Sequence, residues 1–205
     1  MNINIINMFC KESTTDSLNS YFELFYSSTL AGYLEFVDNN GEQLLDYRPT
    51  TRANVIYDLV ISKLKLGLIN DPKVKFLNTN QLLTIIIEDK YILKFKKLNQ
   101  KRKSSNIPTK QTSLFSTQQN LFDFKNESIN LELGYILNKY STEIEGIYLV
   151  CPRNTKSNYW EIDIEDHLLQ NKTDLFNIDP NGPKKPVTRF SVKQEENNDQ
   201  KTETA

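Results

Sequence analysis

The stretch Gln81–Thr109 constrains the fold of this chain more than any other part of the sequence. It begins with an apolar run, continues through a polar pair at Glu88-Asp89, and then alternates apolar residues with lysines. Alternation with a period of two is typical of β-strands, and a short polar break between two such runs is typical of a hairpin turn. We therefore predict two paired strands, Leu82–Ile87 and Lys90–Leu98.

The second predicted strand has two different faces. Successive side chains of a strand point to opposite sides of the sheet. Tyr91, Leu93 and Phe95 therefore point one way, and Lys94 and Lys96 point the other. The pattern predicts one face in the core and one face that presents ammonium groups.

More cations follow this strand, and no Asp or Glu occurs between Lys90 and Phe122. A dense group of cations without acids suits a polyanion, and binding to phosphates should weaken steeply as salt rises. The alternatives are that these cations face the acidic N-terminal segment, or that they only solvate a strand edge. The residues that we predict to bind nucleic acid are Lys94, Lys96, Lys97, Lys101, Arg102, Lys103 and Lys110.

The rest of the sequence predicts an α+β fold, with two N-terminal helices packed on an antiparallel sheet of hairpins and a disordered C-terminal tail. Thr15-Asp16-Ser17 is a plausible N-cap for the first helix. Residues 108–119 form either a short helix or an ordered loop. The expected elements are helices at Leu18–Leu34 and Arg52–Leu66 and strands at Lys73–Leu77, Ile129–Asn138, Gly146–Pro152 and Tyr159–Ile164.

The placement of charges divides the chain. Residues 1–47 hold many acids and a single lysine, so the net charge of −1 conceals a dipolar chain. We predict a single domain at 1–170, made of an acidic helical element at 1–47 and a core at 48–170. Residues 171–205 are polar and rich in linker residues, and are expected to form a linker and the disordered tail.

Arg52 lies in the first turn of the second predicted helix. A cation there is unfavourable, because the N-terminal end of a helix carries partial positive charge. An anion could compensate, which makes Arg52 a hint of an anion site; an ion pair with Asp46 is the alternative.

Cys10 and Cys151 are too few and too far apart to form a disulfide framework or a metal-binding spacing. We predict that both are reduced thiols in a cytoplasmic protein, with Cys151 buried and inert. The first residues lack the basic region of a signal peptide, and no run approaches the roughly 20 apolar residues of a membrane span. No contact with a membrane is therefore expected.

No complete catalytic constellation is visible, and the chain has one histidine, His167. We assign no catalytic residue, metal ligand or cofactor. A helix followed by three strands, with lysines on the third, nevertheless resembles in outline the core of restriction-endonuclease-like nucleases. Such nucleases hold a divalent metal with acids beside a lysine, and the nearest acids here are Asp58, Glu88 and Asp89. A metal-dependent nuclease toxin is therefore an alternative.

The first helix, with aromatic residues on one stripe, permits two interpretations. The stripe either packs in the core or docks a protein partner through Phe22 and Phe25. A protein-interaction subunit or antitoxin, without contact to nucleic acid, is accordingly a second alternative.

Several short motifs resemble a family of uncharacterised bacterial proteins, over roughly Arg48 to Ile164. Members of that family are often encoded near helix-turn-helix repressors, in arrangements similar to toxin–antitoxin or phage-defence modules. The resemblance implies a component of such a module with a protein partner encoded nearby, and our main hypothesis is that it binds nucleic acid through the basic hairpin and loop. The matching motifs are Arg48–Ala53, Glu88-Asp89-Lys90, Phe95-Lys96-Lys97-Leu98, Asn106–Gln111, Gly134-Tyr135, Val150-Cys151-Pro152 and Trp160.

Overall fold

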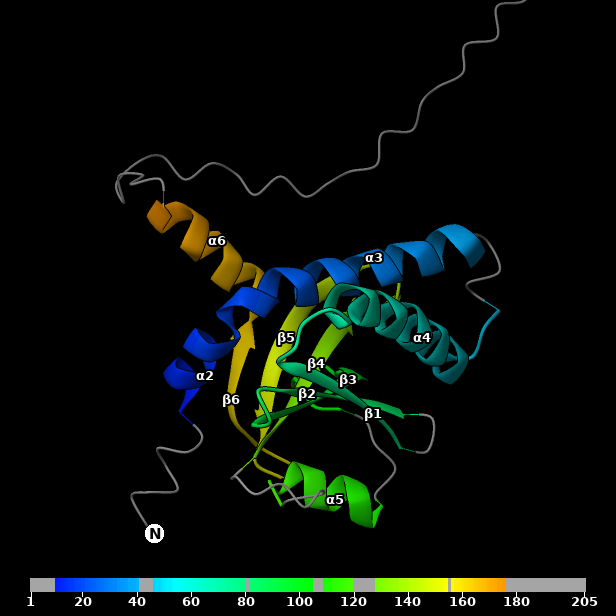
Figure 1. The fold of residues 1–205 in the computed structure, drawn as a ribbon. Coiled ribbons are helices and arrows are strands. Elements are labelled where there is room, and N and C mark those ends of the chain that lie inside the picture. The colour runs from blue at the N-terminus through cyan, green and yellow to red at the C-terminus, as the bar shows by residue number, and fades with distance from the viewer. Residues whose placement is uncertain are drawn as a thin grey trace, which may run out of the picture.

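The computed structural model of this chain describes residues 10–40, 46–79, 82–104, 109–119, 128–154 and 156–175. Helices and a mixed β-sheet form an α+β fold, as predicted (Figure 1). In chain order the elements are α2 (Lys11–Leu18), the 3-10 helix η1 (Asn19–Tyr21), α3 (Phe22–Asn40), α4 (Pro49–Leu68), β1 (Val74–Thr79), β2 (Leu82–Ile87), β3 (Tyr91–Lys97), α5 (Lys110–Ser116), β4 (Ile129–Leu137), β5 (Ile144–Pro152), β6 (Asn158–Asp163) and α6 (Ile164–Leu175).

The six strands follow one another across the sheet in sequence order, from β1 to β6. Each strand is antiparallel to the next, except that β3 and β4 run parallel. We predicted an antiparallel sheet throughout, and the parallel pair is the difference. It arises because the chain crosses from the end of β3 to the start of β4 through α5, and a parallel pair requires such a crossover.

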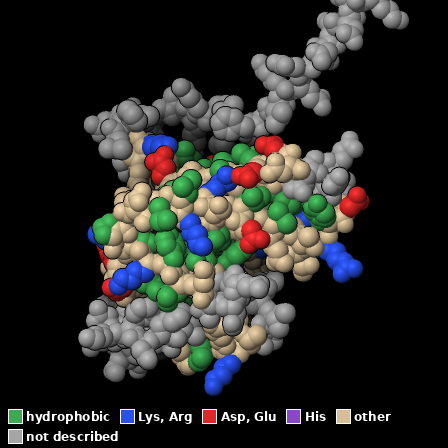
Figure 2. All heavy atoms as spheres, turned by 45° about the vertical axis from the view of Figure 1, so that its right-hand side comes forward, with side chains coloured by type: hydrophobic (Ala, Val, Ile, Leu, Met, Phe, Trp, Pro, Cys, Tyr) green, Lys and Arg blue, Asp and Glu red, His purple; other side chains and the backbone are tan. Residues whose placement is uncertain are grey.

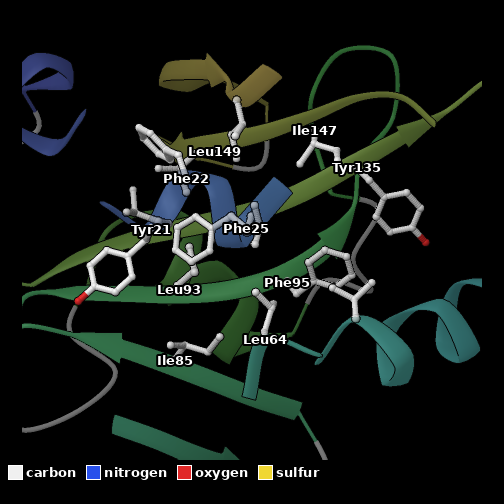
Figure 3. Close-up of a cluster of buried hydrophobic side chains, with 14 of the residues drawn as sticks. Tyr21, Phe22, Phe25, Leu64, Ile85, Leu93, Phe95, Tyr135, Ile147 and Leu149 are labelled. Carbon is white, nitrogen blue, oxygen red and sulfur yellow. The ribbon is translucent and has the colours of Figure 1, made fainter. Parts of the chain in front are cut away.

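The two long helices α3 and α4 pack against each other and cover one face of the sheet (Figure 1). Phe22 and Phe25 of α3 and Leu64 of α4 meet the apolar face of the sheet, including Leu93 and Phe95 of β3 (Figure 3). All five side chains are buried. Removal of this apolar surface from water provides the main force that holds helices and sheet together.

The short helix α5 lies on the opposite face of the sheet (Figure 1). The Thr109 side chain caps it by accepting a hydrogen bond from the backbone N–H of Thr112 at 3.1 Å. Asn130 of β4 is buried and donates from Nδ2 to the carbonyl oxygen of Phe115 at 3.0 Å. Of the two options left open for residues 108–119, the structure contains the short helix, and it lies under the sheet.

The hairpin between β2 and β3 turns at Glu88 and Asp89, as predicted. Both residues adopt positive φ angles, of 55° and 52°, which is the backbone of a type I′ turn. Ion pairs join Glu88 to Lys73, which directly precedes β1, at 2.7 Å and Asp89 to Lys75 of β1 at 2.6 Å. The turn fixes the register in which Lys94 lies beside Thr84.

Two expectations about the ends of the chain need correction. Thr15-Asp16-Ser17 does not cap a helix, because these residues lie inside α2, and the Thr15 hydroxyl donates to the carbonyl oxygen of Lys11 instead. Regular structure also extends beyond residue 170, since α6 reaches Leu175. Of the predicted linker and disordered tail at 171–205, residues 176–205 lie outside the described residues.

Candidate nucleic-acid interface

Two of the three predicted cations on β3, Lys94 and Lys96, point to the face of the sheet that α5 covers. Lys94 and Lys96 lie on the face opposite Phe95, as the strand alternation predicted. The Lys94 ammonium group lies 4.2 Å from the centre of the Phe115 ring of α5. Beside Lys94 in the sheet register stands Glu132 of β4, whose side chain is buried.

Lys94, Lys96, Lys103 and Glu132 form what we name the inner charge cluster. Ser104 donates from its hydroxyl to Oε1 of Glu132 at 2.8 Å. The Lys103 ammonium nitrogen is shielded from solvent and has no hydrogen-bond partner in the described part of the chain. Three predicted phosphate ligands thus surround a buried carboxylate.

Burial governs the ionisation of this cluster. It lowers the pKa of Lys94 to about 8, with a further contribution from repulsion by Lys96, and opposed by attraction to Glu132. Burial likewise lowers the pKa of Lys96 and of Lys103. Burial raises the pKa of Glu132, although the Ser104 hydrogen bond and the neighbouring lysines act in the opposite direction. In all four groups the pKa is therefore shifted in the direction that favours the neutral form.

Arg102, another predicted ligand, is engaged within the protein. Its Nη1 pairs with Oε1 of Glu161 on β6 at 2.6 Å, and its guanidinium lies 4.9 Å from the centre of the Tyr148 ring. The Asn158 side chain donates to the Arg102 carbonyl oxygen at 3.1 Å. Arg102 thus fastens the loop after β3 to β6.

The remaining predicted ligands present their charges differently. Lys97 points to the face of the sheet that α3 and α4 cover. Burial, and after it repulsion by Arg52 of α4, lowers its pKa there. Lys101 is exposed in the loop after β3, and Lys110 is exposed at the start of α5, on the other face. We name Arg52, Lys97 and Lys101 the outer cations. The described residues contain no ion pair between an outer cation and an acid, and the ion pair between Arg52 and Asp46 is absent among them.

A pocket of about 440 Å³ adjoins Lys97, between the first turns of α4 and the end of β3. Its lining residues are Pro49, Thr50, Ala53, Asn54 and Tyr57 from α4, residues 95–99 from β3 and its continuation, and Tyr135 from β4. Figure 2 turns toward the reader the right-hand side of Figure 1, where α4 begins. On the face shown there, basic side chains are separated by acidic and apolar ones, and they form no continuous block.

The partner-binding residues that we predicted lie in the core. Phe22 and Phe25 are both fully buried, and an edge-on contact joins Phe22 to His167 of α6. Of the two interpretations of the aromatic stripe, core packing accounts for these side chains. The surface of α3 does not offer them to a partner.

The acids named for the nuclease alternative do not converge with the lysines of β3. Glu88 and Asp89 pair with β1 at the hairpin turn, and Asp58 is exposed on α4. Among the residues that the structure describes, no three His, Cys, Asp or Glu side chains lie together as a possible metal site.

Sequence reasoning missed Glu132, Glu161, Tyr57 and Tyr135 as parts of the site. Glu132 carried a signal, because it is the one acid in a mostly apolar strand, INLELGYIL. The other three become neighbours of the basic stretch only through the sheet order and the packing of α4.

Comparison of the chain with known protein families, curated proteins and solved structures found no match. In the described part of the chain, no helix combines the length and apolar character needed to cross a membrane.

Proposed function

We propose that this chain is a nucleic-acid-binding component of a bacterial antiviral-defence or toxin–antitoxin module. The motifs from Arg48 to Trp160 support the module, through their resemblance to proteins encoded in such arrangements. The outer cations Arg52, Lys97 and Lys101 support the binding activity, and they replace the broader basic stretch as the surface that contacts phosphates.

One observation carries this proposal: burial, and after it the charge of Arg52, lowers the pKa of Lys97, and among the described residues no acid forms an ion pair with either cation. Two neighbouring cations that lack a counter-charge are destabilising in the free protein. A phosphate placed between them would relieve that repulsion. Arg52 also lies in the first turn of α4, where the helix end itself favours an anion.

The predicted inner ligands take a different role under this proposal. Lys94, Lys96 and Lys103 surround Glu132 on the face under α5, and Arg102 is paired with Glu161. We assign these four residues to internal support of the loop after β3. The loop then holds Lys101 near the end of the strand that carries Lys97.

The test is a salt titration with single substitutions. Arg52→Ala, Lys97→Ala and Lys101→Ala should each weaken binding to fluorescein-labelled duplex and single-stranded DNA or RNA. Each should also lower the slope of log affinity against log salt by about one, because each removes one phosphate contact.

Lys65→Ala is the matched control, because this substitution also removes one positive charge and Lys65 lies at the opposite end of α4. Its affinity and salt slope should equal those of the wild type. Unchanged affinity and slope in all three outer-cation variants would refute the proposed surface. Cleavage of the probe in the presence of magnesium would instead favour the nuclease alternative.

The module is tested separately. The chain should be expressed alone and together with the products of its neighbouring genes, while growth and phage resistance are followed. If no combination of these genes is toxic or protects against phage, the result contradicts a role in a defence or toxin–antitoxin module.

A further inference from the structure

The pocket beside Lys97 combines an aromatic inner wall with a cationic and polar rim. Tyr57, Phe95 and Tyr135 form that wall, with ring centres 6.2 Å apart for Tyr57 and Phe95 and 5.5 Å apart for Phe95 and Tyr135. Phe95 and Tyr135 are buried, whereas Tyr57 is half-buried. The Tyr57 ring is therefore the most exposed part of the wall that a flat apolar group in the pocket could contact.

The inner wall also contains a hydroxyl group without a partner. Tyr135 is only 1% exposed, and its hydroxyl has no hydrogen-bond partner in the described residues. The Tyr33 hydroxyl is also shielded and unpartnered, and it lies close enough to contribute to the raised pKa of Tyr135. Buried polar groups are normally satisfied. Because both hydroxyls are shielded from solvent, a ligand in the pocket would contact the Tyr135 ring and not its hydroxyl.

The rim carries the groups that would orient a ligand. Thr50 and Asn54 on α4 and Asn99 after β3 are exposed. The Thr50 and Asn54 side chains can both donate and accept hydrogen bonds, whereas Asn99 has only its amide N–H groups to offer, because its Oδ1 accepts from the backbone N–H groups of Lys101 and Lys103. Lys97 lines the pocket, and Arg52 stands close to Lys97. The aromatic wall suits a nucleotide base, and the amide groups suit the polar edge of that base. The cations Lys97 and Arg52 suit its phosphate.

The geometry points to this pocket as the binding site of one unpaired nucleotide of a bound strand, with its base against Tyr57 and its phosphate at Lys97 and Arg52. This inference rests on the proposed function, because the outer cations must first hold the strand. The volume of about 440 Å³ lies in the range of roughly 300–1,000 Å³ that is typical of small-molecule sites. A base paired in a duplex cannot reach the wall, whereas a base in a single strand can stack there.

The test fills the pocket without a change in charge. Ala53 lies on the α4 side of the pocket, so Ala53→Phe should occupy the space of the base. We expect its affinity for a short fluorescein-labelled oligothymidylate to fall about tenfold, as the loss of one stacked base implies. Its affinity for duplex DNA, and the salt slope of that binding, should stay equal to those of the wild type.

Two further variants keep the test decisive. Asn54→Phe blocks the rim from an exposed position, and serves if Ala53→Phe does not fold. Ala31→Phe adds the same ring at an exposed position of α3, outside the pocket, and should leave all affinities unchanged. Circular dichroism confirms that each variant is folded.

The outcomes separate this inference from the proposed function. Wild-type affinity for the oligothymidylate in both pocket variants would overturn the nucleotide site and leave the outer-cation surface intact. No binding of any nucleic acid by the wild type would overturn both. Binding of thymidine monophosphate is measured in parallel, to distinguish a free nucleotide from a nucleotide within a strand. If the wild type binds thymidine monophosphate as tightly as it binds the oligothymidylate, the pocket is not a site for a nucleotide of a bound strand.

Discussion

The inner charge cluster leads to a prediction that inverts the usual effect of a core mutation: Lys94→Met should stabilise the protein near neutral pH. The Lys94 ammonium group is half-buried, faces Lys96, and has no ion-pair partner within the described residues. Methionine keeps the length of the side chain and its contact with the Phe115 ring, since thioethers pack well on aromatic rings. The substitution therefore removes a costly charge and retains most of the packing.

The magnitude follows from the ionisation of Lys94. A fall in its pKa from 10.5 to about 8 corresponds to at most about 3.5 kcal/mol, at about 1.4 kcal/mol for each tenfold change in proton affinity. The side chain is only half-buried, so solvent screening reduces this to about half. The lost cation–π contact with Phe115 costs about 0.5–1 kcal/mol. We expect a net gain of about 1 kcal/mol at pH 7.

The gain should depend on pH in a defined direction. Below pH 8 the lysine is charged in both the folded and the unfolded state, so the full cost is present. Between about pH 8 and 10.5 the folded state loses the proton and the unfolded state keeps it, so wild-type stability rises toward that of the variant. The difference in free energy of unfolding should therefore shrink across this range.

Urea unfolding of both proteins, followed by tryptophan fluorescence at a series of pH values, measures this difference. Lys101→Met is the control, because it removes an exposed charge from the same basic stretch and should alter stability by less than about 0.5 kcal/mol. A destabilised Lys94→Met variant, or a gain that stays constant up to pH 10.5, would refute the account of a desolvated lysine.

Three further predictions follow from packing. Phe95→Ala should cost about 3–5 kcal/mol in thermal unfolding, because it opens a cavity between α4 and the sheet, and a loss below 1 kcal/mol would contradict the buried position. Gly32→Ala should lower the free energy of unfolding by about 1–3 kcal/mol, since the new methyl group would lie 2.9 Å from backbone atoms of α4. Gly67→Ala should lower it less, because the new methyl group meets only the end of a leucine side chain. Equal losses for the two variants in chemical denaturation would contradict this distinction. Burial raises the pKa of the Cys151 thiol to about 12. Iodoacetamide should therefore modify Cys10 in the folded protein and Cys151 only after unfolding. Modification is followed by mass spectrometry, and rapid modification of Cys151 in the folded protein would contradict its buried position.

Local patterns were sufficient to predict most of the fold. The apolar run predicted β2 at Leu82–Ile87, the period-two alternation assigned Phe95 to the core, and the structure confirms both. Helix periodicity located α4, whose start at Pro49 lies three residues before the predicted start at Arg52. These features depend on neighbours within a few residues, so the sequence determines them directly.

The composition of the site depended on contacts that local patterns do not contain. Glu132 lies beside Lys94 only because β4 pairs with β3 through a crossover, and Glu161 reaches Arg102 only because β6 lies two strands further on. Cations that are adjacent in sequence looked like one surface. Their actual partners are separated from them by tens of residues, which is why a count of lysines overestimated the surface available to a polyanion.

The parallel pairing of β3 and β4 decides where the candidate site lies. In the observed register Lys97 stands beside Tyr135, near the end of both strands. An antiparallel partner would have placed the opposite end of β4, at Ile129, next to Lys97, and Tyr135 would lie at the other end of the strand pair, away from Phe95. The pleat then sends Lys96 toward Glu132 and Lys97 toward α4, so two consecutive lysines serve opposite faces. The face of Lys97 also carries the first turn of α4 and the pocket of about 440 Å³, and for that reason the proposed nucleotide site lies on this face.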